Sequence, residues 1–112
     1  MELAKRDVKV MRTLVKKGLL NDFAKGLSKA DEILNDWKQE ATDNKEAYHK
    51  LHKHVVDFDK HILRRYDSAK ESDVLYTFIQ QLNEGLVDIA DIKELTREGQ
   101  EEIQKMIRFR KG

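Results

Sequence analysis

Residues 23–62 read FAKGLSKADEILNDWKQEATDNKEAYHKLHKHVVDFDKHI, and apolar side chains recur in this stretch at steps of three and four. Such steps place side chains on one face of a helix and match the heptad pattern by which helices pack together. We call these residues the apolar seam: Phe23, Leu27, Ala30, Leu34, Trp37, Ala41, Tyr48, Leu51, Val55, Phe58 and Ile62. The seam predicts long helices that bury one face each.

The middle of the seam decides between one helix and two. The apolar spacing keeps its phase through Asn44, and neither glycine nor proline interrupts it, so one continuous helix is an open alternative. Residues 43–46, however, have the form of a capping box, in which the Asp43 side chain accepts from the Glu46 amide. We favour a break at Thr42–Asp43, which predicts two long helices in an antiparallel hairpin.

The residues before the seam predict a separate first helix over about residues 3–17, since their apolar side chains share one side of a 3.6-residue repeat. Gly18 can adopt the left-handed conformation that ends a helix. Asn21 can accept from the amides that open the next one. We therefore expect a tight corner at residues 18–21.

After the seam, residues 68–71 form a second capping box, Ser-Ala-Lys-Glu, which predicts the start of another helix. The core face of that helix is expected to contain Val74, Leu75, Phe78, Ile79 and Leu82, and the helix is expected to end at Gly85. Asp88 can cap a last helical segment, which Thr96 and Gly99 interrupt near its middle.

The fold class follows from these elements and from the length of 112 residues, which suits a single domain with one modest core. Alternating apolar and polar runs typical of strands are absent. We predict an all-α, up-and-down helical bundle of four or five helices over residues 1–112, with the two long central helices as a hairpin. The large side chains expected in its core are Trp37, Phe23, Phe58, Tyr48, Tyr76 and Phe78.

Composition excludes several kinds of chemistry. The chain has no cysteine, which rules out disulfides, thiolate catalysis and cysteine-bound metals and fits a cytoplasmic protein. Its apolar runs are far shorter than a membrane span, so we expect no membrane partner. There is neither a nucleophile elbow nor a glycine-rich phosphate loop. We therefore predict a protein that is not an enzyme and carries no cofactor.

All four histidines lie between residues 49 and 61. His54, Asp57 and His61 share one flank of the expected helix at spacings of three and four, which makes them weak candidates for a metal site. Residues facing inward on this helix are apolar and other segments contain no histidine, so we predict no metal and expect solvent-facing imidazoles. Neighbouring carboxylates would favour the protonated imidazoles, which predicts a change in stability or association between about pH 5 and 7.

Charge is distributed unevenly along the chain. Residues 1–17 carry six basic and two acidic groups, and residues 105–112 carry four basic groups and no acidic one, whereas the whole chain has a net charge of +1. Two functions remain: a protein–protein interaction or regulatory module that self-associates, or a nucleic-acid-binding regulator that uses the basic ends. The basic residues of the alternative are Lys5, Arg6, Lys9, Arg12, Lys16, Lys17, Lys105, Arg108, Arg110 and Lys111.

Residues 94–103, ELTREGQEEI, bear on the second function. They resemble the LTxxG run that leads from the wing into the last helix of winged-helix transcription regulators of the MarR and PadR type. This resemblance covers about ten residues and implies DNA binding, with a strand and a wing before Thr96. Residues 86–93 depart from the family, because their apolar spacing is helical.

Overall fold

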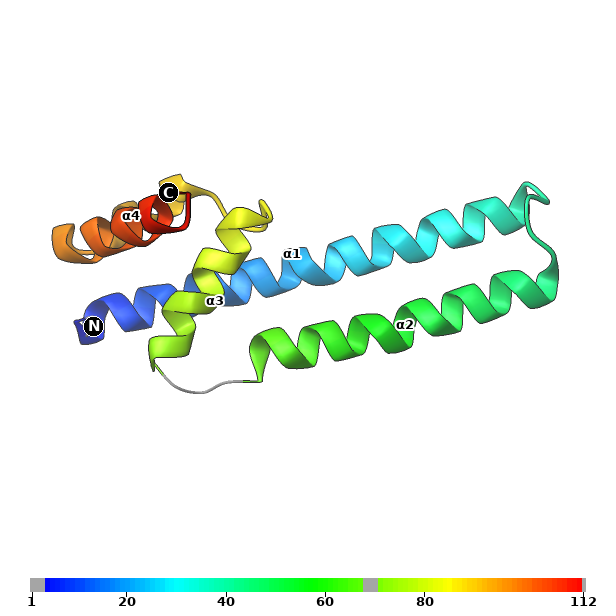
Figure 1. The fold of residues 1–112 in the computed structure, drawn as a ribbon, viewed down its shortest axis with the longest axis horizontal. Coiled ribbons are helices and arrows are strands. Elements are labelled where there is room, and N and C mark those ends of the chain that lie inside the picture. Colours follow the sequence, from blue (N-terminus) through cyan, green and yellow to red (C-terminus); the bar gives the residue numbers. More distant parts are fainter. Residues whose placement is uncertain (1–3, 68–70, 112) are drawn as a thin grey trace. The chain divides into compact units, whose positions relative to one another are not determined.

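The computed structural model describes residues 4–67 and 71–111, and these residues form helices and short connections with no strand (Figure 1). The all-α prediction is confirmed. The elements are α1 (Lys5–Lys38), α2 (Asn44–Tyr66), α3 (Glu71–Asn83), the 3-10 helix η1 (Ile89–Glu94) and α4 (Arg97–Lys111).

Internal contacts divide the chain into two compact units. The hairpin unit is Asp22–Asp67, and the terminal unit combines Met1–Asn21 with Ser68–Gly112. Helix α1 contributes its first part to the terminal unit and its second part to the hairpin unit.

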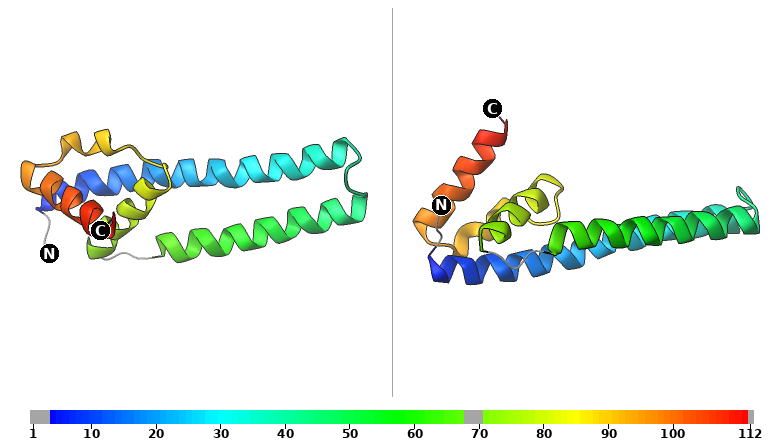
Figure 2. Two further views of the ribbon diagram at one scale, coloured as in Figure 1. Left: turned by 45° about the horizontal axis from the view of Figure 1, so that its top comes forward. Right: turned by 60° about the horizontal axis from the view of Figure 1, so that its bottom comes forward.

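In the hairpin unit, α2 runs antiparallel to the second part of α1, as predicted (Figures 1 and 2). The break lies where the capping box predicts it, because the Asp43 side chain accepts from the Glu46 amide at 2.7 Å and α2 begins at Asn44. Glu40 takes a positive φ of 60° in the connection. The Trp37 indole donates to the Asn44 side-chain oxygen at 2.7 Å and so ties the two helices together at this end.

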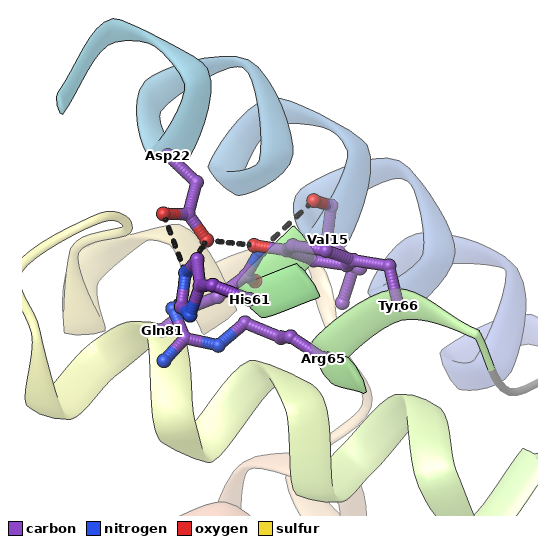
Figure 3. Close-up of polar contacts among 6 residues, drawn as sticks. All are labelled: Val15, Asp22, His61, Arg65, Tyr66 and Gln81. Atoms are coloured by element: carbon purple, nitrogen blue, oxygen red, sulfur yellow. Dashed lines mark hydrogen bonds and ion pairs between the residues drawn. The ribbon is translucent and has the colours of Figure 1, made fainter. Parts of the chain in front are cut away.

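The predicted corner at residues 18–21 is wrong, because α1 continues through it. Gly18 is needed for close packing, since a Cβ atom at this position would lie 2.4 Å from the side-chain nitrogen of Gln81. That nitrogen donates to the Val15 carbonyl at 3.0 Å (Figure 3). Asn21 does not cap a helix; its side-chain amide donates to the Leu86 carbonyl at 2.8 Å. Both residues therefore join α1 to the rest of the terminal unit.

The terminal unit contains the main apolar core. It is formed by Met11, Leu14, Leu75, Phe78, Ile79, Val87, Ile92, Leu95 and Ile103. The predicted core face of α3 is confirmed, because three of its five residues are buried here and the other two pack against them. Gly85, whose φ is 74°, turns the chain just after α3 ends.

The predicted caps of the last segment are partly confirmed. Asp88 forms a capping box with Asp91, but the helix that it opens is the short η1. The interruption occurs at Thr96, and α4 starts at Arg97, with the Thr96 hydroxyl accepting from the Gly99 amide at 3.1 Å. The box at residues 68–71 begins outside the described residues.

A buried carboxylate connects α1 to this interruption. Asp7 is 1% exposed and accepts from the Thr96 amide at 2.8 Å and from the Thr96 hydroxyl. Gly99 leaves room for it, since a Cβ atom there would lie 2.4 Å from an oxygen of Asp7.

The prediction of a core rich in large aromatic side chains is wrong for most of them. Phe78 is fully buried and Phe58 is half-buried, but the other four are exposed: Phe23, Trp37, Tyr48 and Tyr76. For the three exposed aromatic side chains of the hairpin unit, the physical reason is that two helices alone give each other only one narrow inner face. The apolar seam is wider than this inner face, so some of its side chains lie outside the contact between the two helices.

Candidate functional site

The exposed part of the apolar seam is the most prominent surface feature of the hairpin unit. We call it the hairpin face, and its members with their exposed fractions are Phe23 (41%), Leu27 (72%), Leu34 (38%), Trp37 (41%), Tyr48 (68%) and Val55 (47%). An apolar surface of several neighbouring residues at this level of exposure is uncommon on a monomer, which makes it a candidate interaction surface.

Helical geometry places the two halves of the hairpin face on the same side of the hairpin. On α1, the exposed members lie on average about 95° around the axis from the inner residues Asp22 and Ile33. On α2, Tyr48 and Val55 lie about 90° from the inner residue Ala47, in the same rotational sense. Because the helices are antiparallel, both rotations lead to the same side. The hairpin face is therefore continuous across both helices, and on α1 it is about 21 Å long.

The inner face of the hairpin is unusually polar. Of the apolar side chains in this fully described unit, only Ile33 and Ala47 are buried. In the middle, a ring nitrogen of His54 lies 2.8 Å from the Gly26 carbonyl oxygen. The Phe58 ring packs against Gly26 so closely that a Cβ atom there would lie 2.7 Å from it.

A buried carboxylate joins the helices at the open end of the hairpin (Figure 3). Asp22 is 2% exposed and accepts from the Arg65 guanidinium at 3.0 Å and from the Tyr66 hydroxyl at 2.8 Å. The ring nitrogen Nε2 of His61 lies 3.1 and 3.3 Å from its two oxygens. We call these four residues the Asp22 cluster. Since a buried charge needs both a counter-charge and hydrogen bonds, the cluster fixes the spacing and register of the two helices.

The predicted metal candidates do not converge. His54 and His61 are directed at α1, whereas Asp57 receives a hydrogen bond from Lys53 at 2.6 Å. That bond, above all, lowers the pKa of the Asp57 carboxyl from its usual value of 3.8. In residues 4–67 and 71–111, no group of three or more histidine and carboxylate side chains could hold a metal ion.

The histidines differ from one another in environment. His49 and His52 are exposed, as expected, but the prediction of solvent-facing imidazoles is wrong for His54 and His61, which are partly buried and bonded to α1. The same bonds occupy the Nε2 atom of each ring. These two histidines therefore stabilise the hairpin.

The predicted nucleic-acid residues are spread over two helices of the terminal unit. Those on α1 (Lys5, Arg6, Lys9, Arg12 and Lys16) and those on α4 (Lys105 and Arg108) are all exposed, and the side chain of Arg110 lies outside the described part. Within α1, four of them fall in a sector of about 60° opposite the buried face. We call Lys5, Lys9, Arg12 and Lys16 the basic stripe.

The likeness to winged-helix regulators stops at the LTxxG run. Residues 89–94 form η1, and residues 71–88 contain no strand that could build a wing. In this chain Thr96 and Gly99 serve to accommodate Asp7 and to start α4.

Sequence reasoning missed Asp22, Arg65 and Tyr66. A signal was present, because Asp22 and Gly26 are four residues apart on α1, and His54, His61 and Arg65 recur at steps of seven and four on α2. Such spacing places each set on one helix face. Without the hairpin register, nothing in the sequence indicates that the two faces meet.

The terminal unit contains an open pocket of about 650 Å³, which lies between the first part of α1, the residues around Gly85 and α4. Lys17 and Asp91 line it, and their charged groups lie 3.5 Å apart. Asn21, which also lines it, bonds to the Leu86 carbonyl. These three polar side chains of its wall thus already contact other protein atoms.

Among the described helices, none combines the length and the continuous apolar character of a membrane-spanning segment. Comparison with known proteins finds no matching family model, no similar curated protein and no similar solved structure.

Proposed function

We propose that this chain is a non-enzymatic protein–protein interaction module that self-associates through the hairpin face. The observation that carries the proposal is the exposure of six large apolar side chains on one side of a hairpin. A cysteine-free chain of this kind fits a regulatory or adaptor role in the reducing cytoplasm.

The area of the hairpin face supports a specific contact. Side chains of these types expose roughly 150–250 Å² each when free, so the observed fractions leave about 100 Å² exposed per residue. Six residues then offer about 600 Å² per copy, and two copies would bury about 1,200 Å². This value lies at the lower end of the range for stable, specific interfaces.

The hairpin also needs such a contact to bury apolar surface. With only Ile33 and Ala47 buried between its helices, the hairpin unit buries little apolar surface of its own. A second hairpin laid on the face would supply the missing layer and complete a four-helix bundle.

Sedimentation velocity across a range of protein concentrations tests the proposal with a matched pair of variants. Leu27→Glu places a charge on the hairpin face and should make the chain monomeric. Leu63→Glu is the control, because Leu63 is also exposed but lies on the outer side of α2. We expect the control to associate like the unmodified chain. A monomeric unmodified chain, or equal effects of the two changes, would overturn the proposal.

The basic stripe supports nucleic-acid binding as a second candidate function. Its four cations point away from the terminal core over about 16 Å, a length that matches several successive phosphates of one strand. Reversing Lys9 and Arg12 to glutamate should remove salt-dependent binding of duplex DNA, whereas Lys29→Glu in the hairpin unit should not. Failure of the unmodified chain to bind at low salt would eliminate this candidate.

A further inference from the structure

The two ends of the hairpin unit carry opposite charge. At the turn, residues 36–46 contain four acidic and two basic side chains, which gives a net charge of −2. At the open end, residues 22–25 and 60–67 contain two acidic and four basic side chains, which gives +2. Most of these groups are exposed; the exceptions are the buried Asp22 and its partly buried partner Arg65, whose charges cancel. The hairpin is therefore an electric dipole along its length.

Two symmetric arrangements would bury the hairpin face against a second copy. In the parallel arrangement, both turns lie at the same end, and α1 of one copy packs on α2 of the other. In the antiparallel arrangement, the turns lie at opposite ends, and each helix packs on its own counterpart. Both place neighbouring helices antiparallel, so apolar packing alone does not choose between them.

Charge does choose. The parallel arrangement juxtaposes two ends of −2 and two ends of +2, whereas the antiparallel one places each acidic turn beside a basic open end. The ends are separated by about 25 Å along the helices, more than twice the screening length in physiological salt. Each end therefore interacts mainly with the partner end beside it, and like charges placed there oppose association.

We infer that the partner of the hairpin face is a second copy of this chain docked antiparallel, with its acidic turn on the basic open end of the first. This inference rests on the proposed self-association and adds its orientation. The apolar residues of α1 then meet their counterparts around a two-fold axis near Ala30, the midpoint between Phe23 and Trp37.

A distance measurement tests the orientation directly, because the chain has no native cysteine. Ala41→Cys places a single nitroxide label at the turn. In the antiparallel dimer the two labels lie about 30–40 Å apart by pulsed electron spin resonance, since each turn is about eleven residues of helix from the axis. In the parallel dimer the labels would lie less than about 20 Å apart, which would overturn the inference and leave self-association intact.

Charge reversal gives an independent test. Asp36→Lys with Glu40→Lys turns the −2 end into a +2 end, and Lys60→Glu with Arg64→Glu reverses the other end. Either pair alone should weaken the dimer roughly ten-fold at low salt, and all four changes together should restore it. If one reversed end leaves association unchanged at low salt, the antiparallel orientation is wrong. An unmodified chain that is monomeric at all concentrations would instead refute the proposed function.

Discussion

Replacing Asp22 by asparagine tests whether the Asp22 cluster holds the hairpin together. Asparagine keeps the size of the side chain but removes its charge and one acceptor, so the Arg65 guanidinium, 12% exposed, loses its ion pair with residue 22. The Tyr66 hydroxyl also loses a charged acceptor.

The expected loss follows from the burial of each partner. Removing one partner of a buried ion pair costs about 3–5 kcal/mol. His61 is 37% exposed and adds little, as exposed ion pairs contribute at most about 1 kcal/mol. We therefore expect the free energy of unfolding to fall by about 3 kcal/mol, which for a chain of this size lowers the melting temperature by roughly 12–24 °C.

Urea unfolding followed by circular dichroism at fixed protein concentration measures this loss, since association would otherwise change the apparent stability. Asp36→Asn is the matched control, because Asp36 is exposed on the same helix. It should change the free energy by less than about 0.5 kcal/mol. A loss below 1 kcal/mol for Asp22→Asn would refute the role of the cluster.

Three further predictions follow from single contacts. Gly26→Ala should cost about 1–3 kcal/mol, measured by thermal unfolding, because its Cβ atom would overlap the Phe58 ring; an unchanged melting temperature would contradict the close packing. An NMR titration should give the Asp57 carboxyl a pKa below 3.8, and Lys53→Gln should raise that pKa. Because the pKa is lowered in the folded chain, the ionised carboxyl contributes stability above pH 3.8, and this contribution is lost as the pH falls through the lowered pKa. Phe78→Ala should cost about 3–5 kcal/mol in chemical denaturation, and a loss under 1 kcal/mol would mean that the terminal core does not depend on this ring.

Local signals in the sequence predicted much of the fold. The box at Asp43 fixed the start of α2, and the apolar spacing on α3 identified its buried face, because both depend on interactions within a few residues. The helix end predicted at Gly18 was wrong for the opposite reason. The role of Gly18 is set by Gln81, more than sixty residues away, and a glycine that permits close packing looks the same in sequence as one that ends a helix.

The sequence predicted only part of the candidate interface. The persistence of the seam indicated more apolar surface than a hairpin needs, but the sequence could not show which seam residues the hairpin leaves exposed. The exposure of each seam residue depends on which residues occupy the inner face of the hairpin. At the open end Asp22 and His61 occupy it, and no local sequence pattern indicates that these two residues pair. For the same reason, His61 looked solvent-facing when its own helix was considered alone.

The emission of Trp37, the single tryptophan, measures the burial of the hairpin face most directly, because its side chain lies on that face and is 41% exposed in one copy. We predict that dilution shifts the emission maximum to longer wavelength over the same concentration range in which the sedimenting mass falls from dimer to monomer. Emission that stays constant while the mass halves would place the contact elsewhere on the chain, and a mass that never exceeds one copy would contradict self-association itself.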